Sequence, residues 1–319
     1  MSEYLAGGEP AEYLYDLIRD YPSRRGKGIR PALALATCQA YGGSLREAIG
    51  PAIALELLHN AFLIHDDIED ESLSRRGAAA LHELHGVGLA INAGDALASL
   101  AFRPLRGPAL SDRLAARMLD EFSSTVQLTT EGQAMDLGWQ RNNVVDLGPA
   151  EYLAMAARKT CWYTAVLPLR IGAIIGSQGT ASLSALSRFG FFLGAAFQIR
   201  DDILNISGFE HRRKEHFEDI REGKRTLMLL HVLREANDIE RAWLTVFLEK
   251  PERQRSRADV KRVLELMKTC GSLDFADGYA ASMAAAADHL FDEAFNEVPD
   301  SAHKDFLRGL ASYFIARRV

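Results

Sequence analysis

The chain has 319 residues, of which 48% are hydrophobic and 25% are charged, a composition typical of globular proteins. Its formal net charge is −6, so no overall positive field attracts nucleic acid, and we expect no nucleic-acid partner. The cysteines Cys38, Cys161 and Cys270 are odd in number and widely spaced. This spacing argues against a disulfide framework or a zinc site and favours a cytoplasmic location.

We expect neither a secretory signal nor a membrane span. The first 20 residues are acidic and contain no apolar run. The most apolar segment, AVLPLRIGAIIG (165–176), is short and interrupted by Pro168 and Arg170. It therefore predicts a buried core helix and not a membrane span.

Helical periodicity dominates the chain, because apolar residues recur at three- and four-residue spacing, and no convincing alternating strand is found. In chain order, the predicted helices cover residues 12–21, 31–41, 52–70, 113–128, 151–160, 182–204, 225–236, 258–267 and a stretch from about residue 280. The breaks between helical patterns fall at Gly42–Gly43, Gly107–Pro108, Gly148–Pro149, 177–179 and Pro251.

The short breaks predict that neighbouring helices pack antiparallel in one bundle, since no long linker or repeat of fixed period separates them. We therefore predict one all-α domain over residues 1–319, with ten or more helices. The predicted helices 52–70 and 182–205 are apolar almost all round, so they should be central. Both of them end in carboxylates.

The first acidic cluster lies in HDDIEDESLSRRG (65–77), where five carboxylates in seven positions are followed by two arginines. At ~100° per residue, Asp66 and Asp70 share a helix face one turn apart, with Asp67 beside them. A helix C-terminus repels carboxylates, so a bound cation would explain the cluster. For one such cluster alone, a solvated helix end remains an open alternative.

The second acidic cluster has the same spacing, with Asp201, Asp202 and, in the last place, Asn205. Hard oxygen ligands suit Mg²⁺, which usually takes one or two carboxylates, some waters and the oxygens of a phosphate substrate. Two clusters, each at the end of an otherwise buried helix, favour the metal interpretation. They predict a group of Mg²⁺ ions with a diphosphate between them.

Basic residues accompany the acidic clusters, and Arg and Lys are natural partners of diphosphate oxygens. Each alone is more often a surface charge, but their positions next to the acidic motifs favour a role. His59 lies two turns before Asp66, where it is either a satisfied core residue or a contact for a second substrate. The basic candidates are Lys27, Arg30, Arg75, Arg76, Lys159, Lys224 and Arg225.

From about residue 22 to 235 the sequence resembles the trans-isoprenyl diphosphate synthases of the polyprenyl synthetase family. The resemblance rests on GKGIRP (26–31), ELLHNAFLIHDDIEDESLSRRG (56–77), INAGDAL (91–97), GQAMDL (132–137), RKT (158–160), FQIRDDILN (197–205) and EDIREGKRT (218–226). It implies a helical isoprenoid synthase bundle with a central active-site cavity, a homodimer, and Mg²⁺-dependent head-to-tail (1'-4) condensation. The substrates would be isopentenyl diphosphate and an allylic (dimethylallyl, geranyl or farnesyl) diphosphate.

The same resemblance implies roles for individual residues. Mg²⁺ ions, about three per active site, would be held by Asp66, Asp67, Asp70, Asp201 and Asp202. The allylic diphosphate would be contacted by Arg75, Lys159, Lys214 and Lys224, and isopentenyl diphosphate by Lys27, Arg30, His59 and Arg76. Thr160 and Gln198 would line the reacting carbons, and Asp136 would support the basic and metal network.

Three positions depart from the family pattern. Gly28 stands where many members carry a basic residue, which is expected to weaken isopentenyl diphosphate binding slightly. Asn205 replaces the last aspartate of the second motif, although its amide oxygen still accepts hydrogen bonds from water. Lys214 lies where a Gly-Lys pair is usual, so its assignment is less secure than that of Lys224.

Product length should depend on the residues one turn before the first motif, Ala61 and Phe62. At ~1.5 Å rise per residue, Phe62 lies about 6 Å back from Asp66, roughly one isoprene unit. Phe62 favours a short product, whereas Ala61 leaves a path beside it; the alternative is that Phe62 only packs in the core. We predict a twenty-carbon product, geranylgeranyl diphosphate, with the fifteen-carbon farnesyl diphosphate as the alternative.

Two rival functions remain. A class I terpene cyclase shares the first motif but normally has (N/D)DxxSxxxE as its second. Here Asn205 and Phe209 stand in the Ser and Glu places, and the residues assigned to isopentenyl diphosphate would have no use. A non-catalytic subunit of a heteromeric synthase tends to lose acidic ligands, and here only Asn205 departs.

Overall fold

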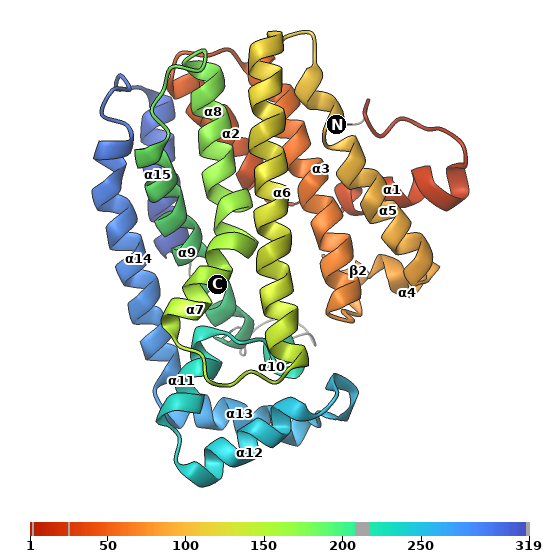
Figure 1. Ribbon diagram of the computed structural model, residues 1–319, viewed down its shortest axis with the longest axis vertical. Coiled ribbons are helices and arrows are strands. Elements are labelled where there is room, and N and C mark those ends of the chain that lie inside the picture. The colour runs from red at the N-terminus through yellow and green to blue at the C-terminus, as the bar shows by residue number, and fades with distance from the viewer. Residues whose placement is uncertain (2, 25, 208–216, 317–319) are drawn as a thin grey trace. The chain divides into compact units, whose positions relative to one another are not determined.

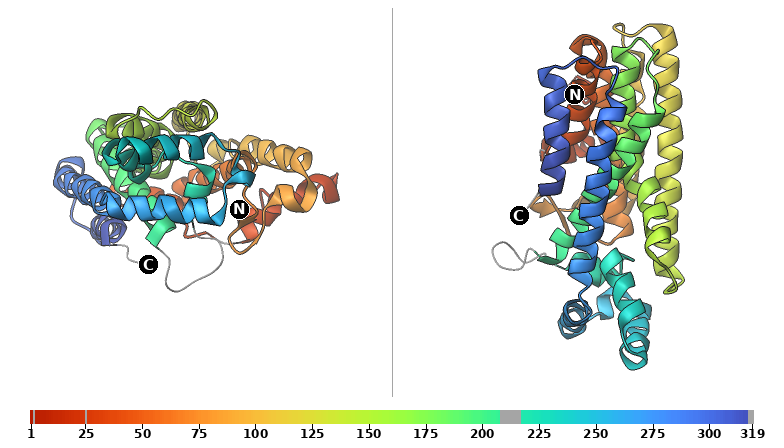
Figure 2. Two further views of the ribbon diagram at one scale, coloured as in Figure 1. Left: turned by 90° about the horizontal axis from the view of Figure 1, so that it is seen from below. Right: turned by 90° about the vertical axis from the view of Figure 1, so that its left-hand side faces the viewer.

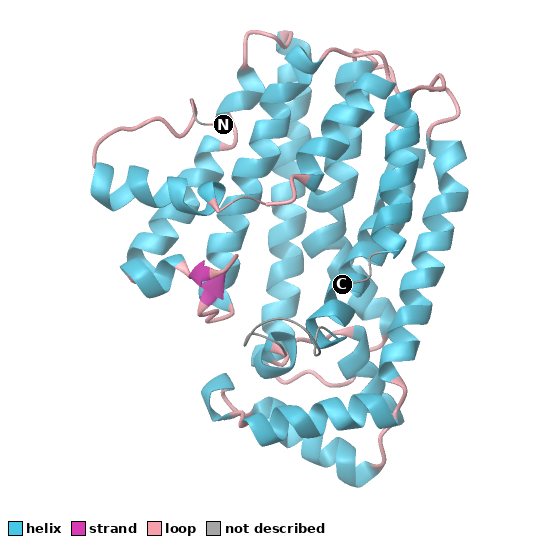
Figure 3. Ribbon diagram, turned by 180° about the vertical axis from the view of Figure 1, so that it is seen from behind, coloured by secondary structure: helices cyan, strands magenta, loops and turns pink. Residues whose placement is uncertain are grey.

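The computed structural model describes the chain except for residues 2, 25, 208–216 and 317–319. Nearly all regular structure in the described part is helical, which confirms the predicted fold class (Figure 3). Within these residues the exception is an antiparallel hairpin of β1 (Ser74–Arg75) and β2 (Ala78–Ala79). The sequence did not predict it, because two-residue strands are too short to show alternation.

Backbone proximity divides the chain into two compact units, each of which is described by itself. Unit 1 comprises residues 1–123, 167–183 and 298–304, and unit 2 comprises residues 124–166, 184–297 and 305–319. The prediction of a single domain over residues 1–319 stays a prediction.

Unit 1 is built around α3 (Leu45–Glu69), which packs against α2 (Ile29–Ala40), α5 (Val87–Leu100) and α8 (Leu167–Gly176) (Figure 1). Helix α3 begins at Leu45 and not at residue 52, because the side chain of Ser44 caps it by accepting a hydrogen bond from the Glu47 N–H at 3.4 Å. The other elements of this unit are η1 (Ala11–Tyr15), α1 (Asp16–Ser23), α4 (Leu81–His85), η2 (Arg103–Arg106) and the first part of α6 (Asp112–Arg141).

Helix α3 is also long and apolar enough to cross a membrane by length and composition. In the structure, 56% of its most apolar stretch is buried, and the core helix of a globular unit meets the same criteria. The expectation of no membrane span stays a prediction.

Unit 2 is built around α9 (Ser184–Ser207), which packs against α14 (Ser272–Ala294), η3 (Ala157–Val166) and α7 (Pro149–Ala156). A buried apolar cluster joins these helices to α11 (Leu227–Glu235), α12 (Asp238–Glu249) and α13 (Arg257–Thr269). Helices α12 and α13 run across one end of α14 (Figures 1 and 2). The shorter or peripheral elements are α10 (Glu218–Glu222), η5 (Glu252–Gln254) and α15 (Ala302–Ala316).

Candidate active site

The α3 cluster, defined as Asp66, Asp67 and Asp70, lies at the C-terminal end of α3 in unit 1. The Asp67 side chain is fully buried, and both of its oxygens accept hydrogen bonds. Oδ2 accepts one from the Tyr21 hydroxyl, and Oδ1 accepts one from Arg75 Nε at 2.7 Å. Asp66 is partly exposed, with its Oδ2 3.8 Å from Arg75 Nη2. The structure thus brings Arg75 to the first acidic motif, and its predicted contact with the allylic diphosphate stays a prediction.

Arg75 lies on β1, and burial alone would lower its pKa. The hydrogen bond and charge of Asp67 outweigh burial and raise the pKa of Arg75, so the guanidinium stays charged. Its neighbour Arg76 occupies the hairpin turn with φ +54°, a left-handed conformation that is uncommon outside glycine. Arg75 and Arg76 have different partners, Asp67 for Arg75 and the Tyr21 carbonyl for Arg76.

Arg30 and Arg76 lie close enough to His59 for their charges to act on its buried ring, and these three residues form the His59 cluster of unit 1. The pKa of His59 lies well below its usual range because the ring is buried and because the charges of Arg30 and Arg76 disfavour protonation. Arg76 donates to the Tyr21 carbonyl at 3.3 Å and approaches Asn60 Oδ1 at 3.5 Å. This cluster joins three of the four residues assigned to isopentenyl diphosphate.

The fourth residue, Lys27, is exposed in the loop before α2. A Cβ atom at Gly26 would lie 2.8 Å from Arg76 Nη2, so the loop passes close to the end of the arginine side chain. Gly28 is the N-cap of α2 and has φ +62°. A basic side chain there would be strained by the backbone, which gives a structural reason for the departure at this position.

The two predicted chain-length residues lie on α3, one turn before the cluster. Ala61 is fully buried and Phe62 is partly buried. The packing alternative for Phe62 therefore remains open.

The α9 cluster, defined as Asp201, Asp202 and Asn205, lies towards the C-terminal end of α9 in unit 2. Asp202 is 7% exposed; its Oδ2 accepts a 2.7 Å hydrogen bond from the Tyr152 hydroxyl, and its Oδ1 accepts one from Gln198 Nε2, also at 2.7 Å. Burial, together with the charge of Asp201, raises the pKa of Asp202 to about 6, although both hydrogen bonds oppose the shift. The Asn205 amide oxygen is buried and accepts no hydrogen bond from the described residues.

Lys159 lies on the π-helix η3 and donates to Asp136 Oδ2 at 2.5 Å. Burial alone would raise the pKa of Asp136, but the charges of Lys159 and Lys224 outweigh it and lower that pKa. A Cβ atom at Gly132 would lie 2.2 Å from the Lys159 backbone nitrogen, so this close approach of α6 to η3 requires glycine. The structure thus brings together three residues that the resemblance places in one basic network. Thr160, also on η3, is buried.

Lys224 lies in the turn after α10, where its Nζ is 2.6 Å from Glu222 Oε2. Burial raises the pKa of Glu222 to about 7, although Lys224 opposes the shift. Arg225 is 1% exposed and donates to the carbonyl of Gly223, to that of Val144 at 3.1 Å and to Asn143 Oδ1 at 2.8 Å. It therefore fixes the turn that carries Lys224.

Sequence reasoning missed Tyr21, Tyr152 and Glu222, and it assigned no specific role to Arg225. Glu222 and Arg225 flank Lys224 in a quoted motif, so their sequence positions could have indicated them. The two tyrosines lie 46 and 50 residues from their aspartate partners, and nothing in the local sequence marks them. Lys214 lies outside the described residues.

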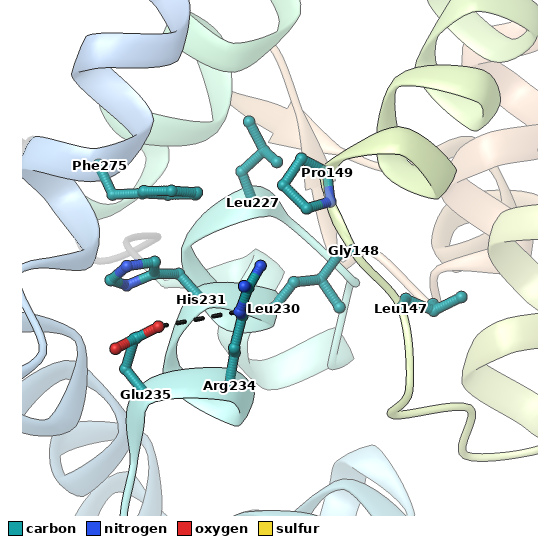
Figure 4. Close-up of a pocket in the computed structure, with 9 residues that line it drawn as sticks. All are labelled: Leu147, Gly148, Pro149, Leu227, Leu230, His231, Arg234, Glu235 and Phe275. Carbon is teal, nitrogen blue, oxygen red and sulfur yellow. Dashed lines mark ion pairs between the residues drawn. The ribbon is translucent and has the colours of Figure 1, made fainter.

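A cavity of about 230 Å³ in unit 2 is lined by the start of α7, one face of α11 and Phe275 of α14 (Figure 4). His231 stacks on Phe275 with ring centroids 4.0 Å apart, and Arg234 and Glu235 form an ion pair at 3.9 Å. None of the residues that line this cavity belongs to the predicted site.

In the described part of the chain, no group of three or more His, Cys, Asp or Glu side chains is arranged to hold a metal ion as it stands. What the structure does show is an all-α protein in which two helices end in aspartate pairs, each beside cations suited to phosphate. These features define a protein of the isoprenoid synthase class.

A sequence model described as polyprenyl synthetase matches residues 11–267. The geranylgeranyl pyrophosphate synthase of Geoglobus acetivorans is 32% identical, over 99% of this chain and 94% of that protein. The crystal structure of geranylgeranyl pyrophosphate synthetase from Pyrococcus horikoshii has a TM-score of 0.86 and 33% identity, covering 99% of this chain and 94% of that one. A geranylgeranyl pyrophosphate synthase from Corynebacterium glutamicum, complexed with isoprenyl diphosphate and magnesium, has a TM-score of 0.87 and 28% identity, covering 98% and 92%. The chain belongs to the polyprenyl synthetase family, and it is a prenyltransferase.

Proposed function

We propose that this prenyltransferase condenses isopentenyl diphosphate with allylic diphosphates in an Mg²⁺-dependent, head-to-tail reaction, with geranylgeranyl diphosphate as its main product. The observation that carries the proposal is that each aspartate pair ends a central helix of its unit and stands beside cations. Arg75 bonds to Asp67, and the charge of Lys224 acts on Asp202. The relatives from Geoglobus acetivorans and Pyrococcus horikoshii, named as geranylgeranyl synthases, support the twenty-carbon product.

The residues present fit Mg²⁺. Asp202 lies beside the Asp201 carboxylate, and burial is the main cause of its raised pKa. Its two hydrogen-bond donors, Tyr152 and Gln198, are uncharged, so its negative charge calls for compensation. A divalent cation with oxygen ligands supplies that compensation. Asp66, Asp70 and Asp201 would hold the ions, and Asp67 and Asp202 would contact them through oxygen lone pairs that their present hydrogen bonds leave available. When bound, Mg²⁺ stabilises the departing diphosphate electrostatically.

The remaining polar residues bind and orient the two substrates. Arg75, Lys159 and Lys224 bind the allylic diphosphate, and Lys214 is proposed from the resemblance alone. Arg30, His59, Arg76 and Lys27 bind isopentenyl diphosphate. The allylic carbon–oxygen bond breaks, the double bond of isopentenyl diphosphate forms the new carbon–carbon bond, and the departed diphosphate accepts the proton that is lost. Apolar surroundings protect the cation from water.

Mass spectrometry of the products of the purified enzyme tests the chain length. We expect a twenty-carbon diphosphate as the main product, and a product that stops at fifteen carbons would select the alternative. Phe62→Ala should add at least one isoprene unit, because it removes a ring about 6 Å along the helix from Asp66, the first residue of the motif. Leu63→Ala, at the adjacent and also partly buried position of α3, is the matched control. An unchanged distribution in Phe62→Ala would show that Phe62 only packs in the core.

We further propose a homodimer, supported by an apolar stripe on α4 and α5. Leu84 of α4 is 54% exposed, and Val87 and Ile91, one turn apart on α5, are 51% and 43% exposed. Sedimentation velocity should show a dimer that Ile91→Glu converts to a monomer. A dimer that survives this substitution would place the interface elsewhere.

A further inference from the structure

We propose that Tyr21 is a positioning residue of the prenyl-transfer site, whose hydroxyl fixes the Asp67 carboxylate and, together with Arg24, the hairpin that presents Arg75 and Arg76. The inference rests on the proposed function, because it concerns residues assigned there to the two substrates. Tyr21 lies on α1, outside every motif that carries the family resemblance.

The first observation is that the Tyr21 hydroxyl forms hydrogen bonds with two elements of the site. Tyr21 is fully buried, its hydroxyl donates to Asp67 Oδ2, and the same oxygen accepts from the Leu81 N–H at 3.2 Å. The other Asp67 oxygen accepts from Arg75. Because Asp67 is also fully buried, water cannot replace the phenol. Tyr21 therefore sets which oxygen faces Arg75 and how the carboxylate is rotated.

The second observation is that the same end of α1 holds the hairpin main chain. Arg24 donates to the Arg75 carbonyl at 2.9 Å and to the Ala79 carbonyl at 2.8 Å, so it binds both strands. Its guanidinium lies 4.6 Å from the centre of the Tyr21 ring and pairs with Asp20 at 2.6 Å. The hairpin has only two residues in each strand, so its own ladder cannot fix it.

The third observation is that Arg75 and Arg76, which are assigned to different substrates, depend on different parts of Tyr21. Arg76 donates to the Tyr21 main-chain carbonyl, which a change of side chain leaves in place. The Arg75 guanidinium is linked to the Tyr21 side chain through the hydroxyl and Asp67. Loss of the hydroxyl should therefore disturb the allylic side of the site and spare the isopentenyl side.

The test is Tyr21→Phe, with Tyr13→Phe at a 55% exposed position as the matched control. We expect Tyr21→Phe to raise the KM for the allylic diphosphate and the half-saturating Mg²⁺ concentration by about tenfold, the effect of losing one hydrogen bond to a charged group. The KM for isopentenyl diphosphate should stay within about twofold, because Arg76 keeps its main-chain partner. Calorimetric titration with Mg²⁺ and the allylic diphosphate, without turnover, should show the same loss of affinity. Equal changes in both KM values would indicate a general structural defect and overturn the proposal.

A double-mutant cycle tests whether Tyr21 acts through Asp67. We expect Tyr21→Phe to add almost nothing to the allylic KM in an Asp67→Asn background, and losses that multiply would contradict the proposal. If Tyr21→Phe does not fold, Arg24→Met provides the second variant. Because it releases the hairpin that carries both arginines, it should raise both KM values, and unchanged values would count against the proposal. A wild-type protein without elongation activity would refute the proposed function, whereas an active wild type with an unaffected Tyr21→Phe would refute only this inference.

Discussion

The α3 cluster and the α9 cluster each bury an aspartate, but they differ in how the charge of that aspartate is compensated. In each, the second aspartate of the pair is buried, and one of its oxygens accepts from a tyrosine of an earlier helix, Tyr21 for Asp67 and Tyr152 for Asp202. The other oxygen accepts from the Arg75 guanidinium in the α3 cluster, but from the neutral Gln198 amide in the α9 cluster. One carboxylate is thus neutralised within the chain, while the other has only uncharged hydrogen-bond donors.

The difference bears on where each cluster obtains its positive charge. Lys224 acts on Asp202 only at a distance, because its ammonium group is 2.6 Å from Glu222. Burial raises the pKa of Asp202 to about 6, and the distant charge of Lys224 opposes this shift only in part. We infer that the α9 cluster depends on a bound cation more strongly than the α3 cluster does.

The largest expected effect is a loss of activity, which we expect from a single substitution in either cluster. Asp66→Asn and Asp201→Asn should each lower kcat/KM for the allylic substrate by about 100- to 1000-fold, because each removes negative charge needed to hold Mg²⁺. Glu69→Gln, at an exposed position at the end of α3, is the control and should stay near wild type. Steady-state kinetics in excess Mg²⁺ measures the effect. A large loss in only one of the two variants would mean that the other cluster is not part of the site.

The next effect concerns stability in the absence of metal. Asp67→Asn should lower the free energy of unfolding by about 3 kcal/mol, because it leaves a largely buried guanidinium without its carboxylate. Asp202→Asn should change it by less than about 1 kcal/mol, because the partners of Asp202 are neutral and its charge is already unfavourable. Urea unfolding in a chelator compares the two variants. Equal losses of unfolding free energy in the two variants would contradict the difference in charge compensation between the two clusters.

The smallest effect is a pair of opposite pH dependences. The pKa of His59 lies below its unfolded value of 6.5, so the unfolded chain binds the extra proton and stability is lost as pH falls below about 6.5. The pKa of Glu222 is raised from 4.5 to about 7, so the folded chain holds the extra proton and stability falls as pH rises through that window. His59→Gln should remove the first of these pH dependences, and Glu222→Gln should remove the second. Each is worth about 1–3 kcal/mol in the free energy of unfolding. Chemical unfolding of the wild type and of each variant between pH 4.5 and 7.5 gives the difference in the free energy of unfolding at each pH. If this difference changed with pH in the same direction for both variants, the assignment would be contradicted.

Periodicity predicted the central helices because α3 and α9 bury side chains on most faces. It missed α5, whose sequence VGLAINAGDALASL is rich in small residues, and the second half of α6, which is largely polar. The aspartates and lysines were predictable because they lie in short sequence motifs whose spacing indicates metal and phosphate binding. The tyrosine contacts were not, since Tyr21 and Tyr152 meet their partners only through tertiary packing.

The most direct test of the central claim is incubation of the purified protein with isotope-labelled isopentenyl diphosphate and an unlabelled allylic (dimethylallyl, geranyl or farnesyl) diphosphate, with and without Mg²⁺. We expect the label to appear in a twenty-carbon prenyl diphosphate only when Mg²⁺ is present. Release of an unlabelled hydrocarbon or alcohol from the allylic substrate alone would identify a cyclase, and no incorporation at all would identify a non-catalytic subunit. Either result would contradict the proposed elongation reaction.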